Sequence, residues 1–226
     1  MKIDYTMDSF RNVGFFAEPE EQDGYPPSGS LITNLAPTFF SGARNGLACA
    51  LAFGSFASGI LSFRSKIAPL TATLIQRLMP NGEVFVDTRA IDFKPTDIQL
   101  GKSTLHVLAA DSFLESTKFV DAVEAMPGNH THLCILKNDG VRGFLSSPRG
   151  RLVCSNYWLR SNLSSASDAL MALCAIALMY SEDLGAGRIL LYGAPEVEDP
   201  FWNALSDVFY SVGISLERAK GNEEQH

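Results

Sequence analysis

Basic residues are scarce in this chain, and they do not cluster. The 226 residues include 18 Lys and Arg against 25 Asp and Glu, which gives a formal net charge of −7 at pH 7. The sequence contains no run rich in Lys and Arg. Because a nucleic-acid-binding surface needs clustered positive charge to neutralise phosphates, this distribution argues against nucleic acid as a partner.

Cysteine pairs and a secretion signal are also lacking. The four cysteines are Cys49, Cys134, Cys154 and Cys174; they form no Cys-x-x-Cys pair and lie in apolar stretches, which is typical of reduced thiols. The first ten residues lack the apolar core of a signal peptide. We therefore expect a cytoplasmic protein with no metal or other cofactor.

One long uncharged segment has to be weighed as a membrane span. Residues 45–63 carry no charge and are flanked by Arg44 and Arg64. A transmembrane helix needs about 20 mainly apolar residues. Six Gly and Ser residues make this segment weakly hydrophobic, and small residues let a buried helix pack closely. We interpret it as a core helix and expect no membrane partner.

A polar cluster precedes a second uncharged segment. Residues 161–168 read Ser-Asn-Leu-Ser-Ser-Ala-Ser-Asp, in which Ser165 and Asp168 have the spacing of a capping box at a helix start. Residues 169–179 carry no charge, so the helix should be buried on every side. The run 189–192 then predicts a short buried strand. A helix start with Asn and Ser beside it is suited to bind an oxyanion or a carbonyl oxygen.

These residues carry a resemblance to a known family. The stretch Asn162-Leu-Ser-Ser-Ala-Ser167, the apolar helix after it and Ile-Leu-Leu-Tyr-Gly at 189–193 resemble the C-terminal half of thiolase-fold enzymes of the β-ketoacyl synthase III type. Residues 23–35 resemble the segment that precedes the nucleophile helix of that family. The resemblance implies that Asn162 is the catalytic Asn and His132, 30 residues upstream, the catalytic His. His130 is the alternative.

The nucleophile of the family has two possible positions here. Aligning residues 53–60 with the family pattern places Phe53 at the nucleophilic Cys, and a phenyl ring cannot attack a thioester. Shifting the alignment by four residues places Cys49 there instead, although the following residues then no longer match. Ser164 and Ser165 would contact the substrate.

The implied fold is α/β, with thiolase-like αβαβα layers and two pseudo-repeated halves around buried central helices. An apolar helix followed by a Gly-bounded strand occurs twice, near 46–86 and 165–192. The chain is shorter than a complete family member, so we expect a truncated single domain over 1–220 with a disordered tail at 221–226. Further expected elements are strands at 13–16, 83–86, 105–109, 133–136 and 151–154, a hairpin turn at 137–140 and a helix at 200–212.

Two functions follow as hypotheses. One is a divergent β-ketoacyl synthase-like protein of acyl-thioester metabolism, of fatty acid or polyketide type, that lacks the nucleophile and acts as a non-elongating subunit of a thiolase-fold complex. The other is an active acyltransferase or condensing enzyme that uses Cys49, His132 and Asn162, or an unrelated α/β acyltransferase. The expected partners are acyl-CoA or acyl carrier protein, and a second copy or a thiolase-fold relative.

Overall fold

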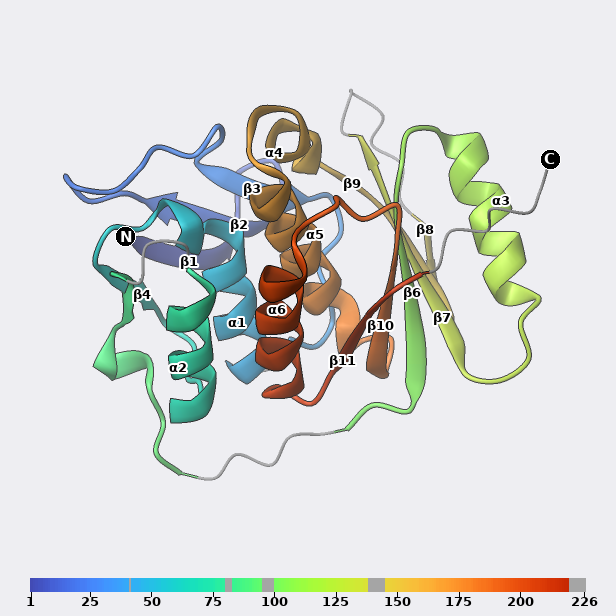
Figure 1. Ribbon diagram of the computed structural model, residues 1–226. Coiled ribbons are helices and arrows are strands. Elements are labelled where there is room, and N and C mark those ends of the chain that lie inside the picture. Colours follow the sequence, from blue (N-terminus) through green and yellow to red (C-terminus); the bar gives the residue numbers. More distant parts are fainter. Residues whose placement is uncertain (41, 80–82, 95–99, 138–144, 220–226) are drawn as a thin grey trace.

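The structure is a computed structural model that describes residues 1–226 except 41, 80–82, 95–99, 138–144 and 220–226 (Figure 1). The described residues form a mixed α/β fold with 11 strands and six α-helices. The elements up to residue 90 are β1 Lys2–Met7, β2 Val13–Glu18, β3 Ser30–Thr33, α1 Gly42–Phe53, the 3-10 helix η1 Gly54–Phe56, β4 Ile60–Phe63, α2 Pro69–Leu78, β5 Phe85–Val86 and η2 Thr88–Ala90. The elements after it are β6 Ser103–Ala110, α3 Phe113–Glu124, β7 His130–Lys137, β8 Leu145–Ser147, β9 Gly150–Ser155, α4 Tyr157–Leu163, α5 Ala166–Ser181, β10 Ala186–Tyr192, α6 Asp199–Tyr210 and β11 Ser215–Arg218.

The strands have the same spatial order in the two halves of the chain. The sheet runs β11-β10-β6-β7-β9-β3-β2-β1-β4-β5, with β8 paired to β9. We number the strands of each half by their order in the chain and leave β8 aside. Read outward from the junction of β9 and β3, both halves then have the order 3-2-1-4-5. The paired neighbours from β9 to β11 in the second half are parallel, whereas β1, β2 and β3 are antiparallel. The difference follows from the connections, because β1 and β2 are joined by only residues 8–12.

The two half-sheets meet at a narrow seam between β3 and β9. A single register pair, Thr33 with Ser155, joins these strands. Side chains complete the junction: Asn156 Oδ1 accepts a hydrogen bond from the Ile32 N–H at 2.8 Å, and Asn34 Oδ1 accepts one from the Cys154 N–H at 2.8 Å. Two asparagine amides thus supply bonds that a longer ladder would take from the backbone.

Two buried helices, α1 and α5, pack against each other in the middle of the molecule (Figure 1). They run antiparallel, because Arg44 at the start of α1 donates to Ser181 at the end of α5, and Arg160, just before α5, donates to the Ala52 carbonyl near the end of α1. Helix α1 also contacts β1, β2 and β4, while α5 contacts β6 and β10. The predicted buried helix is confirmed, since residues 169–181 are all buried.

Helices cover the outer side of only one half-sheet. Helix α3 packs on β6 and β7, on the side away from α1 and α5 (Figure 1). No described helix covers the corresponding outer face of β1, β4 and β5, where Lys2, Ile60 and Phe85 are exposed. The expected α/β class is thus confirmed, whereas the expected thiolase-like αβαβα layering is not. The physical reason lies in the first-half connections, because residues 8–12 and 19–29 contain no helix, whereas the connection from β6 to β7 contains α3.

The sequence suggested that the uncharged segment 45–63 is one helix, and this prediction is wrong. Helix α1 ends at Phe53, and residues 60–63 form strand β4. Among the described residues, no helix has both the length and the hydropathy needed to cross a membrane. The other predicted strands are present, and helix α6 occupies 199–210 of the predicted 200–212. The expected turn beyond residue 137 and the tail at 221–226 lie outside the described residues.

Candidate functional site

Cys49 lies in the middle of α1, where it is closed to solvent. Its side chain is 2% exposed, and the thiol donates a hydrogen bond to Asn45 Oδ1 at 3.4 Å. Burial raises the pKa of this thiol far above its usual range. A nucleophilic cysteine needs the opposite, a pKa lowered by a helix N-terminus or a nearby cation. Cys134, Cys154 and Cys174 are buried as well.

His132 lies on the other side of the sheet from Cys49. On β7, Leu133 and Ile135 belong to the central core together with α1 and α5, whereas Cys134 contacts Ser116 of α3. Because side chains alternate along a strand, His132 faces α3, on the same side as Cys134. Its Nδ1 is buried without a hydrogen-bond partner among the described residues, and burial lowers its pKa. The sheet therefore separates His132 from the proposed nucleophile.

Asn162 is exposed to solvent and does not line the groove described below. The polar cluster begins inside a separate short helix, α4, and Asn162 lies exposed in its last turn. The expected cap is present one step later: Ser165 Oγ accepts a hydrogen bond from the Asp168 N–H at 3.2 Å. Ser164 lies between the two helices, and its hydroxyl is buried without a partner among the described residues. Cys49, His132 and Asn162 thus do not converge on one site.

Phe53, the other candidate position for the nucleophile, has a packing contact with a buried cation. The Arg160 guanidinium carbon lies 4.9 Å from the Phe53 ring centroid and 4.5 Å from that of Phe56. Arg160 is 1% exposed, and burial lowers its pKa to about 10. Because Phe53 is the last residue of α1, it lies at the negative end of the helix dipole, which disfavours a thiolate. A cysteine at this position would therefore meet two opposed influences, because the helix dipole disfavours a thiolate and the Arg160 guanidinium favours one.

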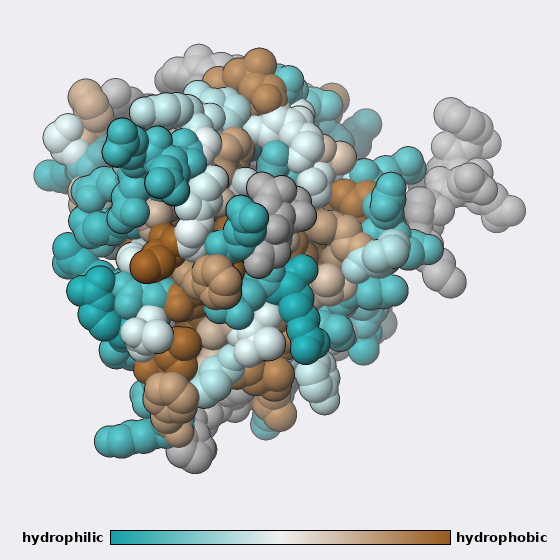
Figure 2. Space-filling model, turned by 60° about the vertical axis from the view of Figure 1, so that its left-hand side comes forward, coloured by the Kyte–Doolittle hydropathy of each residue, from teal (hydrophilic) through white to brown (hydrophobic). Residues whose placement is uncertain are grey.

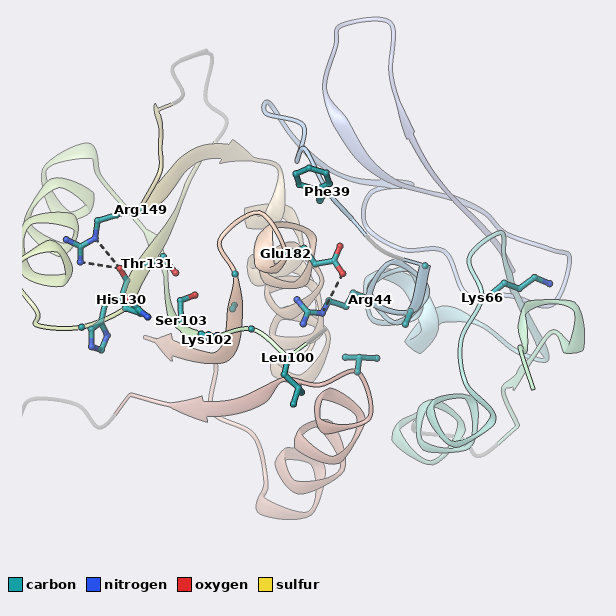
Figure 3. Close-up of a pocket in the computed structure, with 18 of the residues that line it drawn as sticks. Phe39, Arg44, Lys66, Leu100, Lys102, Ser103, His130, Thr131, Arg149 and Glu182 are labelled. Carbon is teal, nitrogen blue, oxygen red and sulfur yellow. Dashed lines mark hydrogen bonds and ion pairs between the residues drawn. The ribbon is translucent and has the colours of Figure 1, made fainter. Parts of the chain in front are cut away.

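A groove of about 1110 Å³ lies at the opposite end of the central helices (Figure 3). The starts of β6, β7 and β10 line it, together with the start of α1 and the end of α5. Its volume exceeds the roughly 300–1,000 Å³ of an ordinary small-molecule site, so an extended ligand would fit. The charged residues that line it are Arg44, Lys66, Lys102, Arg149, Asp92 and Glu182.

An ion pair in the groove links the two central helices. Arg44 Nε lies 3.8 Å from Glu182 Oε1, and Arg44 Nη1 donates to Ser181 Oγ at 3.1 Å. Arg44 is 4% exposed, and its burial lowers the pKa of the guanidinium, whereas Glu182 acts against that shift. This pair joins the start of α1 to the end of α5 and so fixes one wall of the groove.

A line of three aromatic rings crosses the sheet from the groove. His130 Nδ1 lies 2.8 Å from His106 Nε2, and His106 Nδ1 lies 2.9 Å from the Tyr192 hydroxyl. The strand register produces this diagonal, because His130 pairs with Thr104 and Tyr192 with Leu108, two residues on either side of His106. His106 is buried, which lowers its pKa to about 4, so it is neutral near pH 7.

Sequence reasoning identified His130 only as an alternative and missed the rest of the groove. One local signal existed in Gly101: a Cβ there would lie 2.2 Å from the Ala186 backbone, so the chain entering β6 needs glycine to approach β10. The described part of the chain contains no group of three His, Cys, Asp or Glu residues that could hold a metal ion. No family model matches the chain, and comparisons with curated proteins and with solved structures find no match.

Proposed function

We propose that this chain is a divergent β-ketoacyl synthase-like protein of acyl-thioester metabolism that acts as a non-elongating subunit of a thiolase-fold complex in the cytoplasm. The observation that carries the proposal is the duplicated 3-2-1-4-5 strand order around the antiparallel helices α1 and α5. The sequence resemblance at Asn162 and at 189–193 points to the same family. An internal duplication of this kind is what a two-halved thiolase-like fold requires.

The state of the cysteines supports a role without covalent catalysis. An acyl-enzyme needs an accessible thiolate with a base or a cation beside it. All four thiols are buried, and burial raises the pKa of Cys49, Cys134 and Cys174. A buried protonated thiol is a poor nucleophile toward a thioester, which favours the non-elongating subunit over the active condensing enzyme.

Mass spectrometry after incubation with a panel of acyl-CoA and acyl-carrier-protein thioesters tests this choice. We expect no acyl mass on any cysteine, because no thiol combines access with a lowered pKa. A stoichiometric acyl adduct on Cys49 that disappears in Cys49→Ala would overturn the subunit proposal and establish the acyltransferase alternative. Cys174→Ala is the matched control, since this thiol is equally buried in the partner helix α5.

The end of the sheet at β5 is the surface that we propose for association with a second copy or a thiolase-fold relative. Ile60 and Phe85 are register partners on β4 and β5, and each is 57% exposed. Leu70 on the neighbouring helix α2 is also exposed. Figure 2, in which this side of the molecule comes forward, shows hydrophobic side chains among hydrophilic ones. Exposed apolar residues beside a sheet edge favour pairing with another chain.

Light scattering at micromolar concentration and co-purification from the native host test the association. Phe85→Ser should weaken a dimer or the retention of a partner, because it removes apolar area from the proposed contact. Phe113→Ser is the control, since Phe113 is 59% exposed on α3, on the far side of the other half-sheet. A protein that is monomeric and recovers no partner, or equal effects of the two variants, would count against this surface.

A further inference from the structure

The groove carries positive charge in a protein that is negative overall. Four basic and two acidic residues line it, whereas the whole chain has a net charge of −7. Arg44 and Glu182 face each other and largely offset one another. The remaining lining charges are Lys66, Lys102 and Arg149 against Asp92. A cleft lined by one sign of charge concentrates ligands of the opposite sign, so this groove favours an anion.

The positive charge is least compensated at the end formed by Lys102, His130 and Arg149 (Figure 3). These residues lie just before or at the starts of β6, β7 and β9, which are neighbours in the sheet. The Arg149 guanidinium donates to the carbonyl oxygens of His130 and Glu124 at 3.3–3.4 Å, and it makes no ion pair with a described residue. The Lys102 ammonium contacts no described hydrogen-bond or ion-pair partner. Both cations therefore keep their charge available.

His130 can add a hydrogen-bond donor at this end. If the Tyr192 hydroxyl donates to His106 Nδ1, the neutral His106 donates from Nε2 to His130 Nδ1. In this order His130 carries a hydrogen on Nε2, for which the described residues provide no acceptor. In this hydrogen-bond order the His130 Nε2–H is a donor that suits an oxyanion in the groove.

The rest of the groove is less polar. Leu100, Ala186 and Val212 line it, and Phe39 lies at its rim with 68% of its surface exposed. The groove therefore has a cationic end and an apolar stretch within a volume of about 1110 Å³. That combination matches an elongated ligand with an oxyanion at one end and a less polar chain behind it.

We propose that the groove binds an elongated phosphate-bearing ligand, with its phosphate against Lys102, His130 and Arg149 and its less polar part along Leu100 and Val212. Phosphate is favoured over a carboxylate because it carries more negative charge and three acceptor oxygens against the two of a carboxylate. The site does not depend on the subunit role. If the ligand is a coenzyme A thioester, then coenzyme A is the acyl carrier in the function proposed above.

Isothermal titration with three probes tests the site: inorganic phosphate, coenzyme A, and pantetheine, which has no phosphate. We expect coenzyme A to bind more tightly than phosphate, pantetheine to show no comparable binding, and the affinity to fall as salt rises. Lys102→Gln should weaken coenzyme A binding about tenfold, the usual size for one charge-assisted hydrogen bond. Arg149→Gln should weaken it at least as much. Lys118→Gln, on the exposed surface of α3, should leave it unchanged.

The outcomes separate the site from the function. Binding of phosphate without coenzyme A would keep the site but count against an acyl-CoA ligand. Absence of binding by both phosphate-bearing probes, equal binding of pantetheine, or insensitivity to Lys102→Gln would overturn the proposal. Lys102→Gln is decisive because its side chain makes no contact that folding needs, whereas Arg149 also holds two backbone carbonyls.

Discussion

Ala172 in α5 offers the sharpest test of the buried central helix. Its side chain is 0% exposed, and residues 169–181 around it are buried and uncharged, while Asp168 one turn earlier carries the charge sign of a glutamate. Ala172→Glu places a carboxyl group among buried apolar side chains. Either the ion is desolvated or the group stays protonated. A folded pKa that lies about 3–5 units above the unfolded value of about 4.3 costs roughly 3.5 kcal/mol at pH 7, because the penalty stops growing once the folded group keeps its proton.

That cost is large against the stability of an ordinary domain, about 5–15 kcal/mol. For a chain of this length each kcal/mol lowers the melting temperature by about 2–4 °C, so we expect a fall of roughly 7–14 °C at pH 7. The direction in which this destabilisation changes with pH also follows. The folded pKa is raised, so the penalty is small below the unfolded pKa of about 4.3 and grows as pH rises toward the folded pKa.

Thermal unfolding followed by circular dichroism at pH 4 and pH 7 measures both effects. Ala122→Glu is the matched control, because Ala122 is exposed in the last turn of the surface helix α3. A variant at position 172 that melts within a degree or two of the parent at pH 7 would refute the burial of α5. An equal loss at both pH values would show that steric overpacking, and not charge, causes the effect.

Three further outcomes are expected. In the folded protein none of the four cysteines should react with iodoacetamide at pH 8, whereas all should react in denaturant; burial raises the pKa of Cys134 to about 12, and rapid labelling of the folded state would contradict this. Burial lowers the pKa of His106 to about 4, so the stability that neutral His106 contributes is complete above the unfolded pKa of about 6.5 and is lost as pH falls through about 4. Urea unfolding should therefore give a smaller free energy of unfolding at pH 5 than at pH 7.5, and His106→Asn should reduce this difference. Arg160 Nε and Nη1 have no described hydrogen-bond partner, so Arg160→Met should leave the free energy of unfolding unchanged or raise it. A loss above about 3 kcal/mol in the same assay would show that the buried guanidinium is stabilised by its surroundings and would contradict this prediction.

The sequence predicted the elements whose signals are local. Helix α5 follows from a capping serine and an uncharged run, and α6 from an amphipathic pattern after Pro200. Strands β1 and β3 were missed, since neither has a strong pattern of its own and both are defined by pairing with β2. Residues 45–63 were read as one helix because absence of charge fits a buried strand as well as a buried helix.

The groove was beyond the reach of sequence patterns for a different reason. Lys102, His130 and Arg149 are far apart in the chain and become neighbours only because β6, β7 and β9 are adjacent and parallel. A motif search detects residues at fixed spacing, and these have none. The opposite error occurred at Asn162, where the motif was local but the extra helix α4 turns the side chain toward solvent.

At the seam between β3 and β9, the pairing of the two halves depends on particular side chains. A regular ladder can form with almost any side chains, because its bonds come from the backbone. Here one register pair is supplemented by the amides of Asn34 and Asn156, each of which binds backbone of the opposite half. A few side chains therefore determine how the two half-sheets pair. We expect the unfolding of one half to be coupled to that of the other mainly through the packing of α1 on α5.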